Sequence, residues 1–138
     1  MHQPTSDLRI STARPLLSPA ILEEDLPLPA AGAALVQNSR HAVGEILAGR
    51  DDRLLAIVGP CSIHEPAAAL DYAKQLKPVA DRLARDLLVV MRVYFEKPRT
   101  TIGWKGLIND PHLDGSFQVN KGLRLARRLL LDINAAGL

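Results

Sequence analysis

Two short, uninterrupted apolar runs stand out from the mixed polar and apolar pattern of the chain. The first run, residues 54–58, ends at the turn-forming pair Gly59-Pro60, and the second, residues 87–91, ends at Arg92. Apolar runs of this length are typical of strands covered on both faces, as in a parallel sheet. The pattern therefore predicts two buried parallel strands.

Apolar residues at helical spacing predict three helices around these strands. Residues 31–47 form an amphipathic pattern that Gly49 closes, and Pro66 opens a second helix in which Pro78 is expected to cause a kink or a split. A third helix is expected to run to Gly137. The predicted apolar faces are Leu35, Val43, Ile46 and Leu47; then Ala69, Ala73, Leu76, Ala80 and Leu83; then Val119, Leu123, Ala126, Leu130 and Ile133.

Prolines punctuate the start of the chain, where Ser18-Pro19-Ala20 has the pattern of a capped helix start. We therefore expect residues 1–30 to form an arm with one short helix, and residues 31–138 to form an α/β domain. Its order of strand, helix, strand, loop and helix is typical of α/β barrels and of open doubly wound sheets. Two βα units complete neither fold and leave strand edges unpaired, so we expect this organisation to be part of a longer one.

Composition and charge exclude several classes of protein. With 138 residues, 47% of them hydrophobic, the chain is long enough to bury a core and is not a disordered tail. Its 17 basic and 15 acidic side chains are too balanced for binding nucleic acid through charge alone. Residues 1–52 carry 4 basic and 7 acidic side chains, whereas residues 53–138 carry 13 and 8, so small anions are expected to bind in the second part.

The cellular location is also constrained. A single cysteine, Cys61, excludes an internal disulfide and a structural zinc site, and fits a reducing cytosol. The start of the chain lacks a secretory pattern, and no stretch reaches about 18 apolar residues. We expect a cytoplasmic protein with no membrane association.

Cys61 follows the first predicted strand, at the end where catalytic residues of α/β folds gather. Three interpretations are open. The thiol could be a small buried hydrophobe, a nucleophile with His64 as its base, or one of several ligands of a soft divalent metal.

A denser group of polar residues follows the second predicted strand. Segment 92–101 brings together Arg92, Lys97 and Arg99 with Thr100 and Thr101. Solvated surface charge is the alternative, but guanidinium, ammonium and hydroxyl groups are the donors that phosphates and carboxylates require. A phosphorylated, carboxylate-bearing metabolite would suit this segment, and Trp104 nearby is expected to pack rather than to stack on a ligand.

Three segments carry a more specific resemblance. Residues 59–64 (GPCSIH), 91–101 (MRVYFEKPRTT) and 103–111 (GWKGLINDP) are similar to the amino-terminal part of the class I DAHP (3-deoxy-D-arabino-heptulosonate 7-phosphate) synthases. The similarity extends from Asp7 to Leu138, which corresponds to about two of the eight βα units of the family's (β/α)8 TIM barrel. The resemblance therefore implies an incomplete barrel preceded by a helical arm.

The resemblance implies a reaction and the residues that serve it. Phosphoenolpyruvate condenses with erythrose 4-phosphate in the first step of the shikimate route to aromatic amino acids. A divalent metal (Mn²⁺, Fe²⁺, Co²⁺ or Zn²⁺) is required, and Cys61 resembles its thiolate ligand, whereas His64 is not implied as a ligand. Arg92 and Lys97 resemble the catalytic cations that hold phosphoenolpyruvate, and Lys97, Pro98, Arg99 and Thr100 resemble the loop that receives erythrose 4-phosphate.

The resemblance also implies an oligomer and a regulator. In this family the amino-terminal arm reaches a neighbouring subunit and helps to bind an aromatic amino acid that acts as a feedback inhibitor. The corresponding positions here are Asp7 and Ile10, and the full-length protein is implied to be a homo-oligomer.

Two hypotheses cover the 138 residues as they stand. In the first, the chain is part of a DAHP synthase, inactive and marginally stable alone because most metal ligands and barrel strands lie elsewhere. In the second, it is a non-catalytic partner that assembles with a complete synthase subunit. The end of the sequence, a helix plus one residue with no cap over the sheet edge, favours the first.

Overall fold

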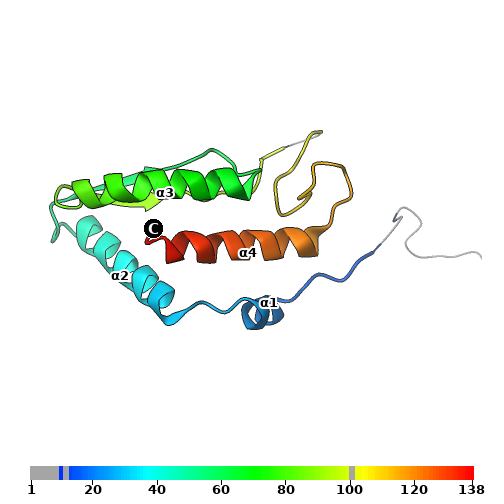
Figure 1. The fold of residues 1–138 in the computed structure, drawn as a ribbon, viewed down its shortest axis with the longest axis horizontal. Helices are drawn as coiled ribbons and strands as arrows, with labels where there is room; N and C mark the ends of the chain where they lie inside the picture. The colour runs from blue at the N-terminus through cyan, green and yellow to red at the C-terminus, as the bar shows by residue number, and fades with distance from the viewer. Residues whose placement is uncertain (1–9, 11–12, 100–101) are drawn as a thin grey trace, which may run out of the picture.

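The computed structural model describes residues 10, 13–99 and 102–138. Its elements are α1 (Pro19–Asp25), α2 (Ala30–Leu47), β1 (Leu54–Val58), α3 (Pro66–Leu83), β2 (Leu87–Met91) and α4 (Val119–Ala135) (Figure 1). This order, the two strands and the position of each helix confirm the sequence-based prediction of an α/β chain.

The two strands of the described sheet are parallel. Leu54 lies opposite Leu87, and Val58 lies opposite Met91. Because α3 connects the strands in a βαβ unit, both strands end at the same edge, where the Arg92 amide donates to the Val58 carbonyl (2.6 Å). The residues that follow each strand are therefore neighbours in space.

The prediction that both strands are covered on two faces is wrong for β1. Leu54 is 70% exposed and Ile57 is 64% exposed, whereas Met91 at the end of β2 is 8% exposed. α3 packs on β2 and α2 contacts β1, but these described elements leave part of β1 open to solvent. An apolar strand is buried on both faces only where a layer lies against each face.

Helix α3 is continuous from Pro66 to Leu83, so the predicted possibility of a split at Pro78 is wrong. A proline inside a helix removes one hydrogen bond to the preceding turn. Here the apolar stripe continues on both sides of Pro78, with Ala73 buried before it and Ala80 partly buried after it. Packing of this stripe against the rest of the domain keeps the helix in one piece.

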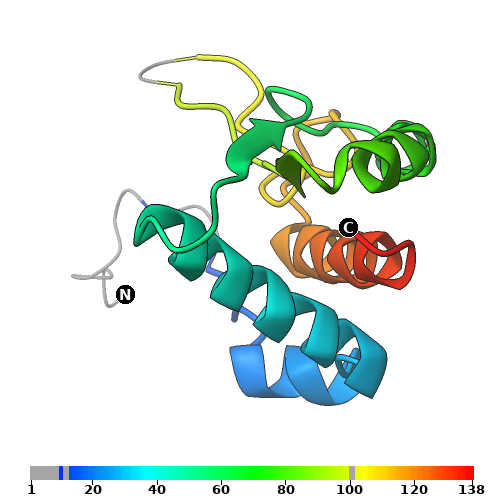
Figure 2. The ribbon, with the colours of Figure 1, turned by 90° about the vertical axis from the view of Figure 1, so that its left-hand side faces the viewer.

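Helix α4 contacts the three other helices, α1, α2 and α3 (Figure 2). Its buried stripe includes Gly122, Ala126, Leu129 and Ile133, and Leu130, predicted to face inward, is 39% exposed. The first turn of α4 sets this rotation, because Gly122 packs so closely on Ile108 that a Cβ there would lie 2.2 Å from the Ile108 carbonyl oxygen.

The segment before α2 docks on a polar face of α4. The Ser18 hydroxyl accepts from the Ile21 amide and caps α1 as predicted, and no residue of α1, all of which are described, is buried. Asn120 accepts from the Leu17 amide (2.8 Å) and donates to the Pro15 carbonyl (3.0 Å), and Arg124 pairs with Asp25 (3.2 Å). Polar contacts therefore hold residues 15–25 of the arm.

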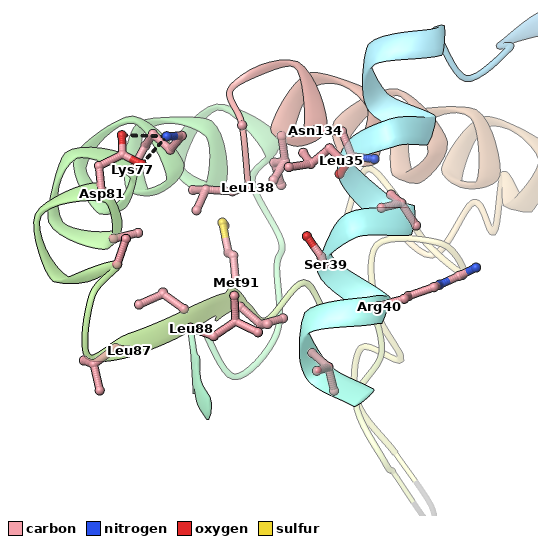
Figure 3. A pocket seen from close by; sticks show the side chains of 18 of the residues that line it. Leu35, Ser39, Arg40, Lys77, Asp81, Leu87, Leu88, Met91, Asn134 and Leu138 are labelled. Carbon is pink, nitrogen blue, oxygen red and sulfur yellow. Dashed lines mark hydrogen bonds and ion pairs between the residues drawn. The ribbon is translucent and has the colours of Figure 1, made fainter. Parts of the chain in front are cut away.

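A cavity of about 630 Å³ opens beside β2, between α2, α3 and the end of α4 (Figure 3). Leu88 and Met91 line it from the strand, Leu35 and Ser39 from α2, and Leu138 from the end of the chain. We call this space the flank cavity. Within the described residues, no helix is both long and apolar enough to cross a membrane.

Candidate functional site at the strand ends

The site is built where β1 and β2 end side by side. Gly59 has a φ of +147°, and a Cβ at this position would lie 2.5 Å from the Arg92 carbonyl oxygen. Only glycine permits this close approach of the two backbones. Beyond it, the Ile63 amide donates to the Tyr94 carbonyl (2.8 Å), so the two loops stay joined after the strands have ended.

Arg92 is fixed by three contacts. One of its terminal nitrogens, Nη1, donates to the carbonyls of Pro60 (2.7 Å) and Cys61 (2.6 Å). Its guanidinium carbon lies 4.8 Å from the centre of the Tyr94 ring, within cation–π range. These contacts attach the first cation of the predicted anion site to the loop that carries Cys61.

Cys61 is exposed, so the interpretation as a buried hydrophobe is wrong. Its sulfur lies 3.8 Å from Lys97 Nζ, which places a positive charge beside the thiol. His64 forms no hydrogen bond with Cys61 in the described contacts and instead lines a separate pocket of about 320 Å³ with Glu65 and Tyr72. The geometry therefore does not support His64 as the base of a cysteine nucleophile.

The backbone of Lys97 is fixed by a second chain segment. Glu96 forms an antiparallel bridge with Gly106, and the Lys97 amide donates to the Lys105 carbonyl (2.9 Å). Gly106 has a φ of +131°, and a Cβ there would lie 2.1 Å from the Phe95 carbonyl oxygen. The start of segment 103–111, one of the three segments that carry the family resemblance, thus serves as a support for Lys97.

Trp104 and Asp110 brace this support from behind. Trp104 packs against the hydrophobic core, as predicted, and its indole nitrogen donates to the Asp110 carbonyl (2.8 Å). Asp110 is 5% exposed, and its carboxylate accepts from the Gly115 amide (3.0 Å). The sequence pattern gives no signal for the burial of Asp110, because an Asp-Pro pair in a loop is typical of an ordinary turn.

We call residues 59–63, 92–97 and 103–110 the strand-end region. It brings together three of the predicted site residues, Cys61, Arg92 and Lys97. Pro98 and Arg99 follow on the exposed part of the loop, and Thr100 lies outside the described residues. Of the predicted inhibitor positions, Ile10 is 59% exposed and Asp7 lies outside the described residues.

Cys61 is a metal donor exposed at the strand end. A thiolate is a good ligand for divalent transition metals. Across the described part of the chain, no group of three or more His, Cys, Asp or Glu side chains is arranged to hold a metal ion. Cys61 fits the role of one ligand in a set that needs donors from other segments.

Comparison with known proteins places the chain in a family. The model of the DAHP synthetase I family matches residues 27–136. A phospho-2-dehydro-3-deoxyheptonate aldolase of Amycolatopsis methanolica is 63% identical over 124 residues, which are 90% of this chain and 61% of that protein. The Phe-sensitive enzyme of the same name from Escherichia coli K12 is 56% identical over 138 residues, which are 100% of this chain and 39% of that enzyme.

A solved structure agrees with these sequences. The phospho-2-dehydro-3-deoxyheptonate aldolase of Francisella tularensis superposes with a TM-score of 0.90 at 52% identity, covering 94% of this chain and 38% of that one. The chain thus spans between about two fifths and three fifths of the length of these relatives. On the sequence match and the shared fold, the chain belongs to the DAHP synthetase I family.

Proposed function

We propose that the strand-end region is part of the active site of a DAHP synthase, where phosphoenolpyruvate condenses with erythrose 4-phosphate. The observation that carries this proposal is the meeting of Cys61, Arg92 and Lys97 at the ends of two adjacent parallel strands. The aldolase name of the relatives and the family of the chain support the same reaction.

In this proposal the cations bind and orient two substrates that repel each other. Arg92 and Lys97 hold the phosphate and carboxylate of phosphoenolpyruvate, and Lys97, Pro98, Arg99 and Thr100 receive erythrose 4-phosphate. The enol carbon C3 of phosphoenolpyruvate forms a bond with the aldehyde carbon, water adds at C2, and the C2–O bond breaks to release inorganic phosphate. Fixed cations help because they offset the repulsion and hold the reacting carbons in attack geometry.

Cys61 would hold a divalent metal (Mn²⁺, Fe²⁺, Co²⁺ or Zn²⁺) through its thiolate, together with ligands from segments outside these 138 residues. Such an ion, when bound, polarises the aldehyde oxygen as a Lewis acid. Lys97 Nζ lies 3.8 Å from the sulfur, so a positive charge stands beside the proposed ligand atom. Because no three His, Cys, Asp or Glu side chains of the described residues are arranged to hold a metal ion, we propose that the chain alone does not turn over.

The remaining parts of the proposal concern the whole protein. The two βα units would be the first two of a (β/α)8 barrel, and the open edge of β2 beside the flank cavity suits the addition of strands. Residues 1–30 would act as an arm that contributes Asp7 and Ile10 to an aromatic amino acid site in a cytoplasmic homo-oligomer. Relatives named Phe-sensitive and Tyr-sensitive support such a regulator.

A hybrid enzyme tests the proposed reaction. This chain replaces the aligned segment of the Escherichia coli Phe-sensitive relative, and consumption of phosphoenolpyruvate is followed with erythrose 4-phosphate and Mn²⁺. We expect turnover that depends on both substrates and is lost in Cys61→Ala, together with no turnover by the 138-residue chain. A soluble, folded hybrid without activity, beside an active parent enzyme, would refute the proposal and favour the non-catalytic assembly partner.

A further inference from the structure

The contacts within the described chain use only some of the N–H donors of the Arg92 guanidinium. A guanidinium has five N–H donors, and the two on Nη1 are directed at the Pro60 and Cys61 carbonyls. Among the contacts of the described residues, the edge formed by Nε and Nη2 has no hydrogen-bond partner. Such an edge offers two parallel donors to the two oxygens of a carboxylate or phosphate.

The Arg92 guanidinium lies over the face of the Tyr94 ring. Arg92 and Tyr94 are separated by one position in the loop that follows β2. The Arg92 guanidinium carbon stands 4.8 Å from the Tyr94 ring centre. A contact with the ring restricts rotation of the guanidinium, and among the described contacts Nε and Nη2 remain without a hydrogen-bond partner.

The backbone of Tyr94 is hydrogen-bonded to the loop that carries Cys61. Its carbonyl accepts from the amide of Ile63, a residue that is 3% exposed and belongs to the core. This hydrogen bond fixes the backbone of Tyr94, although Tyr94 as a whole is 37% exposed. Within the described residues the Tyr94 hydroxyl makes no hydrogen bond, so its contribution comes from the aromatic face.

We propose that Tyr94 is a positioning residue whose ring holds the Arg92 guanidinium so that its Nε–Nη2 edge faces a carboxylate or phosphate. The orientation of Arg92 is a property of the free chain. The identification of the anion as phosphoenolpyruvate rests on the proposed function.

The first experiment reads Arg92 directly, by NMR of its Nε–Hε group in the complete 138-residue chain. We expect Tyr94→Phe to keep the ring-shifted Hε resonance and Tyr94→Leu to move it to the position of a solvent-exposed arginine. Tyr72→Leu is the matched control, because Tyr72 is 38% exposed on α3 and is not stacked on Arg92 in the described contacts. An Arg92 resonance that is unchanged in Tyr94→Leu would overturn the proposal.

A second variant keeps the test decisive if Tyr94→Leu does not fold. Tyr94→Trp presents a larger aromatic face, so the Arg92 Hε resonance should move further in the direction of the ring-current shift. The same resonance position with Tyr, Phe and Trp at this site would show that the ring does not face the guanidinium, and would overturn the proposal.

Titration of the hybrid enzyme, and of its variants at Tyr94, with phosphoenolpyruvate then separates the positioning role from the identity of the anion. We expect Tyr94→Leu to weaken binding about two- to five-fold and Tyr94→Phe to leave it unchanged. Equal binding by the Leu, Phe and unmodified hybrids would contradict the positioning role. If the unmodified hybrid enzyme fails to bind phosphoenolpyruvate while the Arg92 resonance responds as expected, the positioning role stands and the proposed substrate is wrong.

Discussion

The strand-end region and the flank cavity share β2 but differ in how completely they are packed. At the strand ends, backbone hydrogen bonds join Arg92 to Val58, Tyr94 to Ile63 and Lys97 to Lys105. Beside the strand, a space of about 630 Å³ separates apolar side chains of α2, β2 and the end of α4 (Figure 3).

The difference shows which parts of a βα fold are local. Turns and cross-loop hydrogen bonds need only the two neighbouring units, so the candidate site takes shape between residues 59 and 110. An apolar face becomes buried only when another layer covers it, and the described elements do not cover all of β1 or β2. The following experiments disturb one region at a time.

The largest effect is expected from closing the space that Gly106 leaves open. In Gly106→Val the side chain would collide with the Phe95 carbonyl and a φ of +131° would be strained, so we expect a loss of about 3 kcal/mol or more. Urea unfolding followed by circular dichroism measures it. Gly44→Ala in α2, where a Cβ meets nothing within 4 Å, is the control and should leave stability equal or slightly higher. Equal behaviour of the two variants would show that the Gly106 contact is not needed.

The second largest effect distinguishes Lys97, whose side chain faces the Cys61 thiol, from Lys105, whose backbone carbonyl accepts from the Lys97 amide. We expect Lys97→Met to weaken phosphoenolpyruvate binding roughly ten-fold or more, because the positive charge beside Cys61 is lost. Lys105→Met should change binding less than about two-fold, because Lys105 contributes its backbone carbonyl. Isothermal titration of both variants makes the comparison, and a larger loss in Lys105→Met would reverse the assignment.

Filling the flank cavity should stabilise the chain without changing the site. Ser39 lines this cavity from α2, and Ser39→Leu adds apolar surface to it, for an expected gain of about 0.5–1 kcal/mol. Asn38→Leu, at the adjacent exposed position, corrects for helix propensity and should give no comparable gain. Thermal melts of both variants, together with binding of a hydrophobic dye, test whether the cavity is open in solution.

The smallest effect concerns acid, which acts away from the site. Hydrogen bonds from Arg50 hold the pKa of Glu45 below 4.5, and hydrogen bonds from Arg53 hold the pKa of Asp51 below 3.8. A lowered folded-state pKa stabilises the fold above the unfolded-state value, and this contribution is lost as the pH falls through the folded-state pKa. The free energy of unfolding should therefore decrease slightly as the pH falls below about 4.5. In urea titrations at pH 3–7, the double variant Glu45→Gln/Asp51→Asn should show a smaller change of this free energy with pH.

Sequence patterns predicted the strands and helices well because each element here has a clear period and a clear terminator. The run 54–58 and the cap Ser18 are local features, and both appear in the structure as expected. The rotation of α4 was not predictable from the spacing of large residues, because Gly122 packs against the Ile108 backbone and brings Leu129 inward in place of Leu130.

The site shows the same division between local and tertiary information. From the sequence, Cys61, Arg92 and Lys97 are expected to lie near one another, because residues that follow parallel strands meet at one edge of the sheet. The stacking of Tyr94 on Arg92 and the burial of Asp110 depend on how two loops cross, and no local pattern encodes that crossing.

The central claim, that this strand-end region works in DAHP synthesis, is tested most directly by the kinetics of the hybrid enzyme with single changes at the two lysines. If the claim is right, Lys97→Met lowers kcat/KM for phosphoenolpyruvate by roughly 100-fold or more, and Lys105→Met changes it by less than about three-fold. A Lys97→Met hybrid that is as active as the unmodified hybrid would contradict the claim.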